Sequence, residues 1–130
     1  MSLKLNHINH VAVIASDYQK SKNFYVELLG LKVINETYRA HRDSYKLDLQ
    51  VDEHSQIELF SFPNPPARIT NPEATGLRHL AFEVDNVSDV YNFLKAKNIE
   101  VEEIRIDEIT NKKFTFFRDP DDLPIEVYER

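Results

Sequence analysis

The organisation of this chain is clearest in the segment Gly76-Leu77-Arg78-His79-Leu80-Ala81-Phe82-Glu83-Val84. Apolar residues follow a glycine, a pattern typical of a β-strand. A histidine lies inside the predicted strand, where a titratable ring is unusual unless something binds it. The segment Asn9-His10-Val11-Ala12-Val13-Ile14 has the same character, and the two histidines are 69 residues apart. This spacing indicates an internal repeat.

Other residues follow the same repeat. Phe24 corresponds to Phe93 at a spacing of 69 residues, and Glu58 corresponds to Glu126 at a spacing of 68. Each half is predicted to contain a strand, a helix and three further strands. The predicted fold class is therefore α+β, with two tandem βαβββ modules.

The modules are predicted to form a single domain over residues 1–130. Module one spans about residues 6–62 and module two about residues 76–130. The linker between them, about residues 63–75, holds four of the six prolines.

The pattern also predicts the individual elements. In module one, strands are expected over residues 8–15, 31–37, 44–51 and 56–62, the first buried on both faces. A helix of about three turns, capped at Ser16-Asp17 and ended by Gly30, follows the first strand. In module two, a helix capped by Asn86 and ended by Asn98 precedes strands over residues 99–106, 114–117 and 124–128.

Composition excludes several classes of function. A net charge of −6 argues against binding to nucleic acid backbones. The chain has no cysteine, so disulfides, thiolate ligands and a cysteine nucleophile are excluded. It has no run of about 20 apolar residues and no export signal, so we expect a cytoplasmic protein without membrane contact.

The repeat also pairs the residues that carry chemistry. Two histidines occupy the first strands, and two glutamates lie between apolar neighbours in Ile57-Glu58-Leu59 and Ile125-Glu126-Val127. A carboxylate buried without a cation costs several kcal/mol. If the modules are related by approximate two-fold symmetry, the four side chains converge and suit a divalent ion such as Zn, Ni, Co, Mn or Fe. Each residue alone has an ordinary structural explanation, and the repeat is what favours a metal site.

The chain resembles the vicinal oxygen chelate superfamily, and within it the glyoxalase-I-like stand-alone bacterial proteins. The resemblance covers nearly the whole chain and rests on Ile8-Asn9-His10-Val11-Ala12, Ser21-Lys22-Asn23-Phe24-Tyr25 with Leu29-Gly30-Leu31, Ile57-Glu58-Leu59, Leu77-Arg78-His79-Leu80-Ala81-Phe82, and Phe117-Arg118-Asp119-Pro120-Asp121 with Pro124-Ile125-Glu126. It implies mixed sheets curled around a metal-binding cleft and a homodimer. The metal ligands that it implies are His10, Glu58, His79 and Glu126.

The resemblance also implies a reaction. A glyoxalase-I-like lyase or isomerase converts a small molecule with vicinal oxygens through an enediolate, with the metal as a Lewis acid. The family pattern assigns proton transfer to Glu126, with Glu58 as a second candidate. The substrate and the metal are left open, as is whether one chain or two build each cleft.

The thiol cosubstrate is where the sequence departs from glyoxalase I. Glutathione-using members typically carry Arg four residues after the first ligand and Asn four residues after the second, where this chain has Ile14 and Phe62. Neither apolar side chain makes those polar contacts, so glutathione bound in the usual way is disfavoured. The residues that we expect to line a substrate pocket are Arg39, Arg42, Tyr45, Phe60, Phe62 and Arg118.

Other members of the superfamily provide the alternatives. An epimerase of the methylmalonyl-CoA type usually has Gln where this chain has Glu58. An antibiotic-resistance or antibiotic-binding protein of this fold needs no set of metal-ligating residues. An extradiol dioxygenase needs two histidines and one carboxylate on iron, so the fourth residue counts against it.

Overall fold

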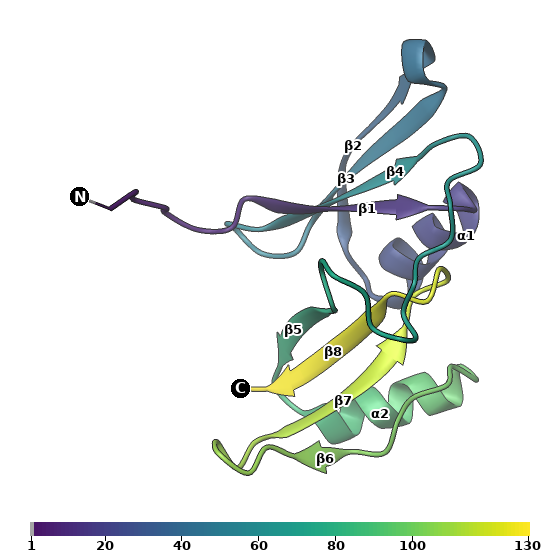
Figure 1. Cartoon of the computed structure of the whole chain (residues 1–130). Helices are drawn as coiled ribbons and strands as arrows, with labels where there is room; N and C mark the ends of the chain where they lie inside the picture. Colours follow the sequence, from purple (N-terminus) through teal and green to yellow (C-terminus); the bar gives the residue numbers. More distant parts are fainter. Residues whose placement is uncertain (1) are drawn as a thin grey trace. The chain divides into compact units, whose positions relative to one another are not determined.

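A computed structural model describes residues 2–130 of the chain (Figure 1). The chain divides into two compact units, one ending at Ala67 and the other beginning at Arg68. Each unit holds one four-stranded sheet and helical segments packed on one face of it. Among residues 2–130, no helix has the length and apolar character needed to cross a membrane.

The first unit is built around a mixed sheet with the strand order β1-β4-β3-β2. Strand β1 runs parallel to β4, and the other neighbours are antiparallel. Its elements are β1 (His10–Ala15), α1 (Tyr18–Lys22), the π-helix η1 (Asn23–Leu28), β2 (Lys32–Arg39), the 3₁₀-helix η2 (Ala40–Arg42), β3 (Ser44–Gln50) and β4 (Gln56–Ser61).

The second unit repeats this topology, with the strand order β5-β8-β7-β6 and β5 parallel to β8. Its elements are β5 (Leu80–Val84), α2 (Val87–Ala96), β6 (Arg105–Ile106), β7 (Lys113–Arg118) and β8 (Pro124–Glu129). The prediction of an α+β fold made of two βαβββ modules is confirmed.

Each sheet has one covered face and one open face. In β4, Ile57 and Leu59 are buried, whereas Glu58 between them is partly exposed. In β8, Ile125 and Val127 are buried in the same way and flank Glu126. The buried residues face the helical side, where α2 contacts β7 and β8 (Figure 1). The glutamates therefore lie on the open faces, together with the histidines.

The residues predicted to cap and end the helices are confirmed. The Asp17 side chain accepts a hydrogen bond from the Lys20 N–H, and Asn86 accepts one from the Asp89 N–H, so both are N-caps. Gly30 and Asn98 have φ of 76° and 59°, the left-handed conformation expected after a helix.

Two predictions in the first unit are wrong in detail. The first strand is buried on one face only: Val13 and Ala15 are buried, but Ile14 is 53% exposed. Burial on both faces requires helices on both sides of a sheet, and in this unit only one side is covered. The helix is not regular either, because its second half is a π-helix, in which Tyr25 becomes fully buried.

Two predictions in the second unit are also corrected. The strand expected over residues 99–106 is reduced to a bridge at Val101 and the two residues of β6. The apolar alternation passes through Val101 but resumes at Ile104, so it changes face and a continuous strand is lost. His79 lies one residue before β5, not inside it, since the carbonyl groups of the two preceding residues accept hydrogen bonds from Arg68.

Candidate metal centre

In the first unit, His10 and Glu58 meet on the open face. The parallel pairing of β1 with β4 sets Ala12 opposite Glu58, and His10 points to the same face as Ala12. His10 Nε2 lies 3.5 Å from Glu58 Oε1, and the glutamate side chain is only 16% exposed. His10 Nδ1 lies 2.8 Å from the amide oxygen Asn9 Oδ1, an acceptor, so Nδ1 carries the proton. In that tautomer Nε2, which faces Glu58, carries the lone pair that a metal ion would use.

In the second unit, His79 and Glu126 form the corresponding pair. Strands β5 and β8 set Ala81 opposite Glu126, which matches the position of Ala12 opposite Glu58. His79 Nε2 lies 3.1 Å from Glu126 Oε1, and the glutamate side chain is 14% exposed. The two glutamates thus have the same place in their sheets, and each histidine lies two residues before the alanine opposite its glutamate.

The proton of His79 lies on the other ring nitrogen. Its Nδ1 is 3.1 Å from Arg78 Nη1, and a guanidinium can only donate. With Nδ1 as the acceptor, Nε2 is the nitrogen that donates to Glu126. Binding of a metal through Nε2 requires the proton to leave that atom and Arg78, which also pairs with Glu73, to move aside.

The surroundings of the two glutamates differ. Opposite Glu58, strand β3 places Asp48, and Lys46 Nζ lies 3.3 Å from Asp48 Oδ1 and 3.8 Å from Glu58 Oε2. Opposite Glu126, strand β7 places Phe116, whose ring packs edge-on against His79 at 5.1 Å. One pair therefore lies in a charged environment and the other in an aromatic one.

The donor chemistry of the four residues suits a divalent ion, since imidazole nitrogens and carboxylate oxygens are its usual ligands. Within residues 2–130, however, no group of three or more histidine, aspartate or glutamate side chains gathers to hold a metal. The structure brings the predicted ligands together as two pairs, one in each unit. A single pair supplies fewer ligands than the three or four protein groups of a zinc-type site.

The predicted pocket residues of the first unit divide into two groups. The Arg39 guanidinium lies over the rings of Phe60 and Phe62, at 4.9 and 5.7 Å, and Arg42 lies over Phe62 at 4.9 Å. Tyr45 is separate from them, because it stacks against Tyr18 with 4.8 Å between ring centroids. Arg39, Arg42, Phe60 and Phe62 therefore form one cation–π cluster without Tyr45.

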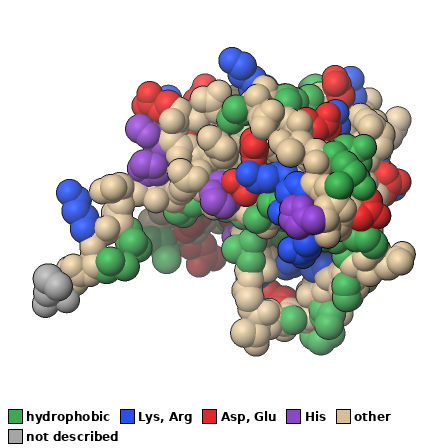
Figure 2. Space-filling model, turned by 90° about the horizontal axis from the view of Figure 1, so that it is seen from above, with side chains coloured by type: hydrophobic (Ala, Val, Ile, Leu, Met, Phe, Trp, Pro, Cys, Tyr) green, Lys and Arg blue, Asp and Glu red, His purple; other side chains and the backbone are tan. Residues whose placement is uncertain are grey.

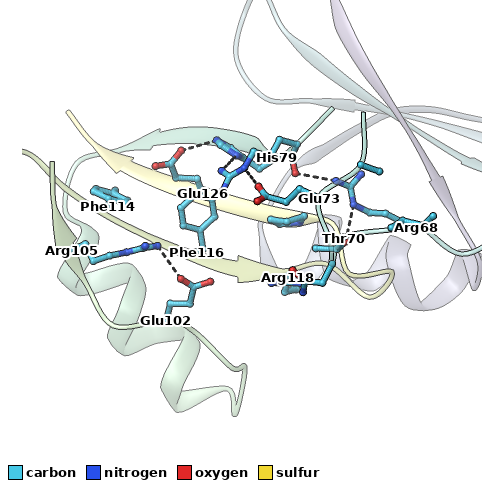
Figure 3. A pocket seen from close by; sticks show the side chains of 15 residues that line it. Arg68, Thr70, Glu73, His79, Glu102, Arg105, Phe114, Phe116, Arg118 and Glu126 are labelled. Atoms are coloured by element: carbon cyan, nitrogen blue, oxygen red, sulfur yellow. Dashed lines mark hydrogen bonds and ion pairs between the residues drawn. The ribbon is translucent and has the colours of Figure 1, made fainter. Parts of the chain in front are cut away.

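Arg118, the remaining predicted pocket residue, lines a cavity of about 440 Å³ in the second unit (Figure 3). His79 and Glu126 line the same cavity. The sequence interpretation missed its other principal lining residues, Arg68, Arg78, Arg105, Phe114 and Phe116. In the sequence, Arg105 lies between Ile104 and Ile106. This alternation was the one signal that could have placed it on the open face.

The histidines of the candidate site are accessible from solvent. Figure 2 shows histidine side chains at the surface with acidic and basic side chains beside them. His10 and His79 keep 41% and 26% of their side-chain surface exposed, so a ligand can reach both.

Comparison with known proteins places this geometry in a family. The chain is 58% identical to the uncharacterized protein YwkD of Bacillus subtilis over 126 residues, covering 97% of this chain and 98% of YwkD. It is 51% identical to the uncharacterized protein YaeR of Escherichia coli over 128 residues, covering 98% and 99%. The crystal structure of a glyoxalase family protein from Enterococcus faecalis superposes with a TM-score of 0.87 at 49% identity, covering 95% and 97%.

More distant relatives carry names that state a function. The metallothiol transferase FosB of Staphylococcus saprophyticus is 28% identical over 95% of this chain and 77% of FosB. Mouse mitochondrial methylmalonyl-CoA epimerase is 31% identical over 74% of this chain and 56% of the epimerase. Residues 7–127 match the model of one family, so the chain belongs to the Glyoxalase/Bleomycin resistance protein/Dioxygenase superfamily, which confirms the resemblance drawn from its motifs.

Proposed function

We propose that the protein is a divalent-metal-dependent enzyme, a glyoxalase-I-like lyase or isomerase that acts on a small molecule with vicinal oxygens. The observation that supports this most is that each sheet carries a glutamate at the equivalent register position, in contact with a histidine two residues before the opposing alanine. Packing does not require two partly buried carboxylates at repeated positions, whereas a four-ligand ion site does.

In this proposal His10, Glu58, His79 and Glu126 hold one ion, contributed by one chain or by two chains of a homodimer. The ion, when bound, supplies Lewis-acid polarisation of the substrate oxygens. The protein supplies the ligands, a carboxylate that transfers a proton and a cavity that positions the substrate.

Glu126 is the better candidate for proton transfer. It lines the 440 Å³ cavity beside His79 and Phe116, so a substrate carbon in that cavity lies next to its carboxylate. Glu58 does not line this cavity, and its Oε2 lies 3.8 Å from the Lys46 ammonium. Its surroundings therefore favour a role as a ligand rather than as the group that meets the substrate.

The second candidate function is a metal-dependent epimerase, which uses the same carboxylate chemistry on an acidic carbon. The mouse methylmalonyl-CoA epimerase supports it as a relative at 31% identity. Glu58, at a position where that branch usually has Gln, counts against it. A role in antibiotic resistance has weaker support, from FosB at 28% identity.

Proton exchange in heavy water tests both enzymatic candidates. Metal-loaded protein is incubated in D₂O with hemithioacetals of 2-oxoaldehydes and, separately, with methylmalonyl-CoA, and deuterium in the product or the recovered substrate is measured by NMR. Glu126→Gln should slow exchange by about 10²-fold or more, as expected for loss of a general base. Glu53→Gln is the matched control because that side chain is 84% exposed in the β3–β4 turn. Full activity of Glu126→Gln, or full activity after metal chelation, would contradict the proposal.

A further inference from the structure

Arg105 occupies an unusual position on the open face of the second sheet. Its guanidinium lies over Phe114 and Phe116, at 5.0 and 5.5 Å from the ring centroids. One carboxylate, Glu102, accepts a hydrogen bond from Nη2 at 2.9 Å, and both side chains remain about half exposed. Stacking holds the guanidinium plane and leaves its edge, with the remaining N–H groups, free for another acceptor.

The strand order places Arg105 across the cavity from the His–Glu pair. Glu126 lies on β8, Phe116 on the neighbouring β7, and Arg105 on β6 beyond it. Figure 3 shows Phe116 between Glu126 and the Arg105–Glu102 pair. The Phe116 ring contacts both groups, since its centroid lies 5.1 Å from that of His79 and 5.5 Å from Arg105 Cζ.

The charge of the cavity is opposite to that of the chain. Four arginines and three glutamates line the cavity, whereas the whole chain has a net charge of −6. Arg68 is engaged with carbonyl groups, Arg78 with Glu73 and His79, and Arg118 with Asp122. Arg105 is the one of the four that stacks on aromatic rings, and it pairs with Phe114, two residues before the Phe116 that lies opposite Glu126.

We propose that Arg105 binds an anionic oxygen group, a carboxylate or a phosphate, on the small molecule that this cavity accepts. The guanidinium edge matches either group through two parallel N–H···O bonds. Glu102 engages Nη2 of Arg105 in the free protein and competes for that nitrogen with the incoming anion. The link to catalysis rests on the proposed function: the substrate then carries its vicinal oxygens near His79 and Glu126 and its anion one phenyl ring away.

Anion binding by metal-free protein tests the proposal separately from catalysis. EDTA-treated full-length protein is titrated with inorganic phosphate and, in a second arm, with malonate, by NMR and calorimetry. At least one anion should bind saturably at one site, and the stronger arm identifies the chemical class. Arg105→Gln should weaken that binding by about tenfold or more, while Glu102→Gln should strengthen it several-fold because a competing carboxylate is removed. A gain of affinity cannot arise from misfolding.

Three further variants sharpen the result. Arg130→Gln is the matched control, since this arginine is 78% exposed and does not line the cavity; it should bind as the wild type does. Arg105→Lys keeps the charge but not the planar fork, so its binding should be intermediate. His79→Ala should lose metal but keep phosphate or malonate binding, which separates failure of this proposal from failure of the metal site. Absence of saturable binding of both anions, or unchanged binding in Arg105→Gln, overturns the proposal.

Discussion

Arg68 holds the segment that delivers His79 to the cavity, and its removal should have a measurable cost. Its Nε donates to Thr70 Oγ1 at 3.0 Å, and its Nη2 donates to the carbonyl oxygens of Leu77 and Arg78 at 2.9 and 3.0 Å. Arg68→Met keeps much of the apolar volume of the side chain and removes all three hydrogen bonds.

The expected magnitude follows from these three bonds. A net contribution of about 1 kcal/mol each gives about 3 kcal/mol as an upper value. Two of the acceptors are at exposed positions, where water replaces the lost donor, so we expect the free energy of unfolding of the second unit to fall by about 2 kcal/mol. At 1.36 kcal/mol per tenfold change, this is about a 30-fold increase in the population of the open state.

Amide hydrogen exchange at Val127 measures this change within the second unit. Val127 is 4% exposed and pairs with Phe82 on one side and Thr115 on the other, so its amide exchanges mainly when the unit opens. Arg68→Met should raise its exchange rate about 30-fold. Arg130→Met, which removes a highly exposed arginine, should change it less than about threefold. Equal exchange rates in Arg68→Met and wild type would refute the role given to Arg68.

Two other predictions concern stability. Leu94 is 1% exposed and its neighbour Phe93 is 45% exposed, so Leu94→Ala should lower the free energy of unfolding by about 2–5 kcal/mol and Phe93→Ala by much less, as measured by urea denaturation; equal losses would contradict the assignment of the core face. The Ile109 N–H and the Tyr128 hydroxyl donate to the Asp107 carboxylate and hold its pKa below the ordinary 3.8. The stabilisation that the ionised Asp107 carboxylate provides is therefore complete above about pH 3.8 and is lost as the pH falls through the lowered pKa. The stability difference between wild type and Asp107→Asn should narrow in acid, and a difference independent of pH would contradict this.

The repeat explains why so much of the candidate site could be predicted from sequence. His10, Glu58, His79 and Glu126 are related by spacings of 68 and 69 residues, and the strand pairing reproduces that relation as Ala12 opposite Glu58 and Ala81 opposite Glu126. Alternation in Ile57-Glu58-Leu59 and Ile125-Glu126-Val127 was sufficient to place both glutamates on the face opposite the core.

The residues that sequence reasoning missed depend on long-range contacts. Arg105 belongs to a strand of only two residues, and its position over Phe114 and Phe116 follows from pairing with β7, which local periodicity does not encode. The change of face between Val101 and Ile104 was visible in the sequence, but its effect on strand length depends on the neighbouring strand.

The central claim is that the two His–Glu pairs belong to one metal site, and metal stoichiometry tests it most directly. Full-length protein is reconstituted with each candidate ion, desalted and analysed by inductively coupled plasma mass spectrometry. We predict about one divalent ion per chain for the wild type and close to none for His10→Ala and for His79→Ala, because each variant removes a ligand from the same set. His54→Ala, which changes a histidine that is 64% exposed in a turn, should retain the ion. Less than about 0.1 ion per chain in the wild type, or retention of half or more of the metal in His10→Ala or His79→Ala, would contradict the claim.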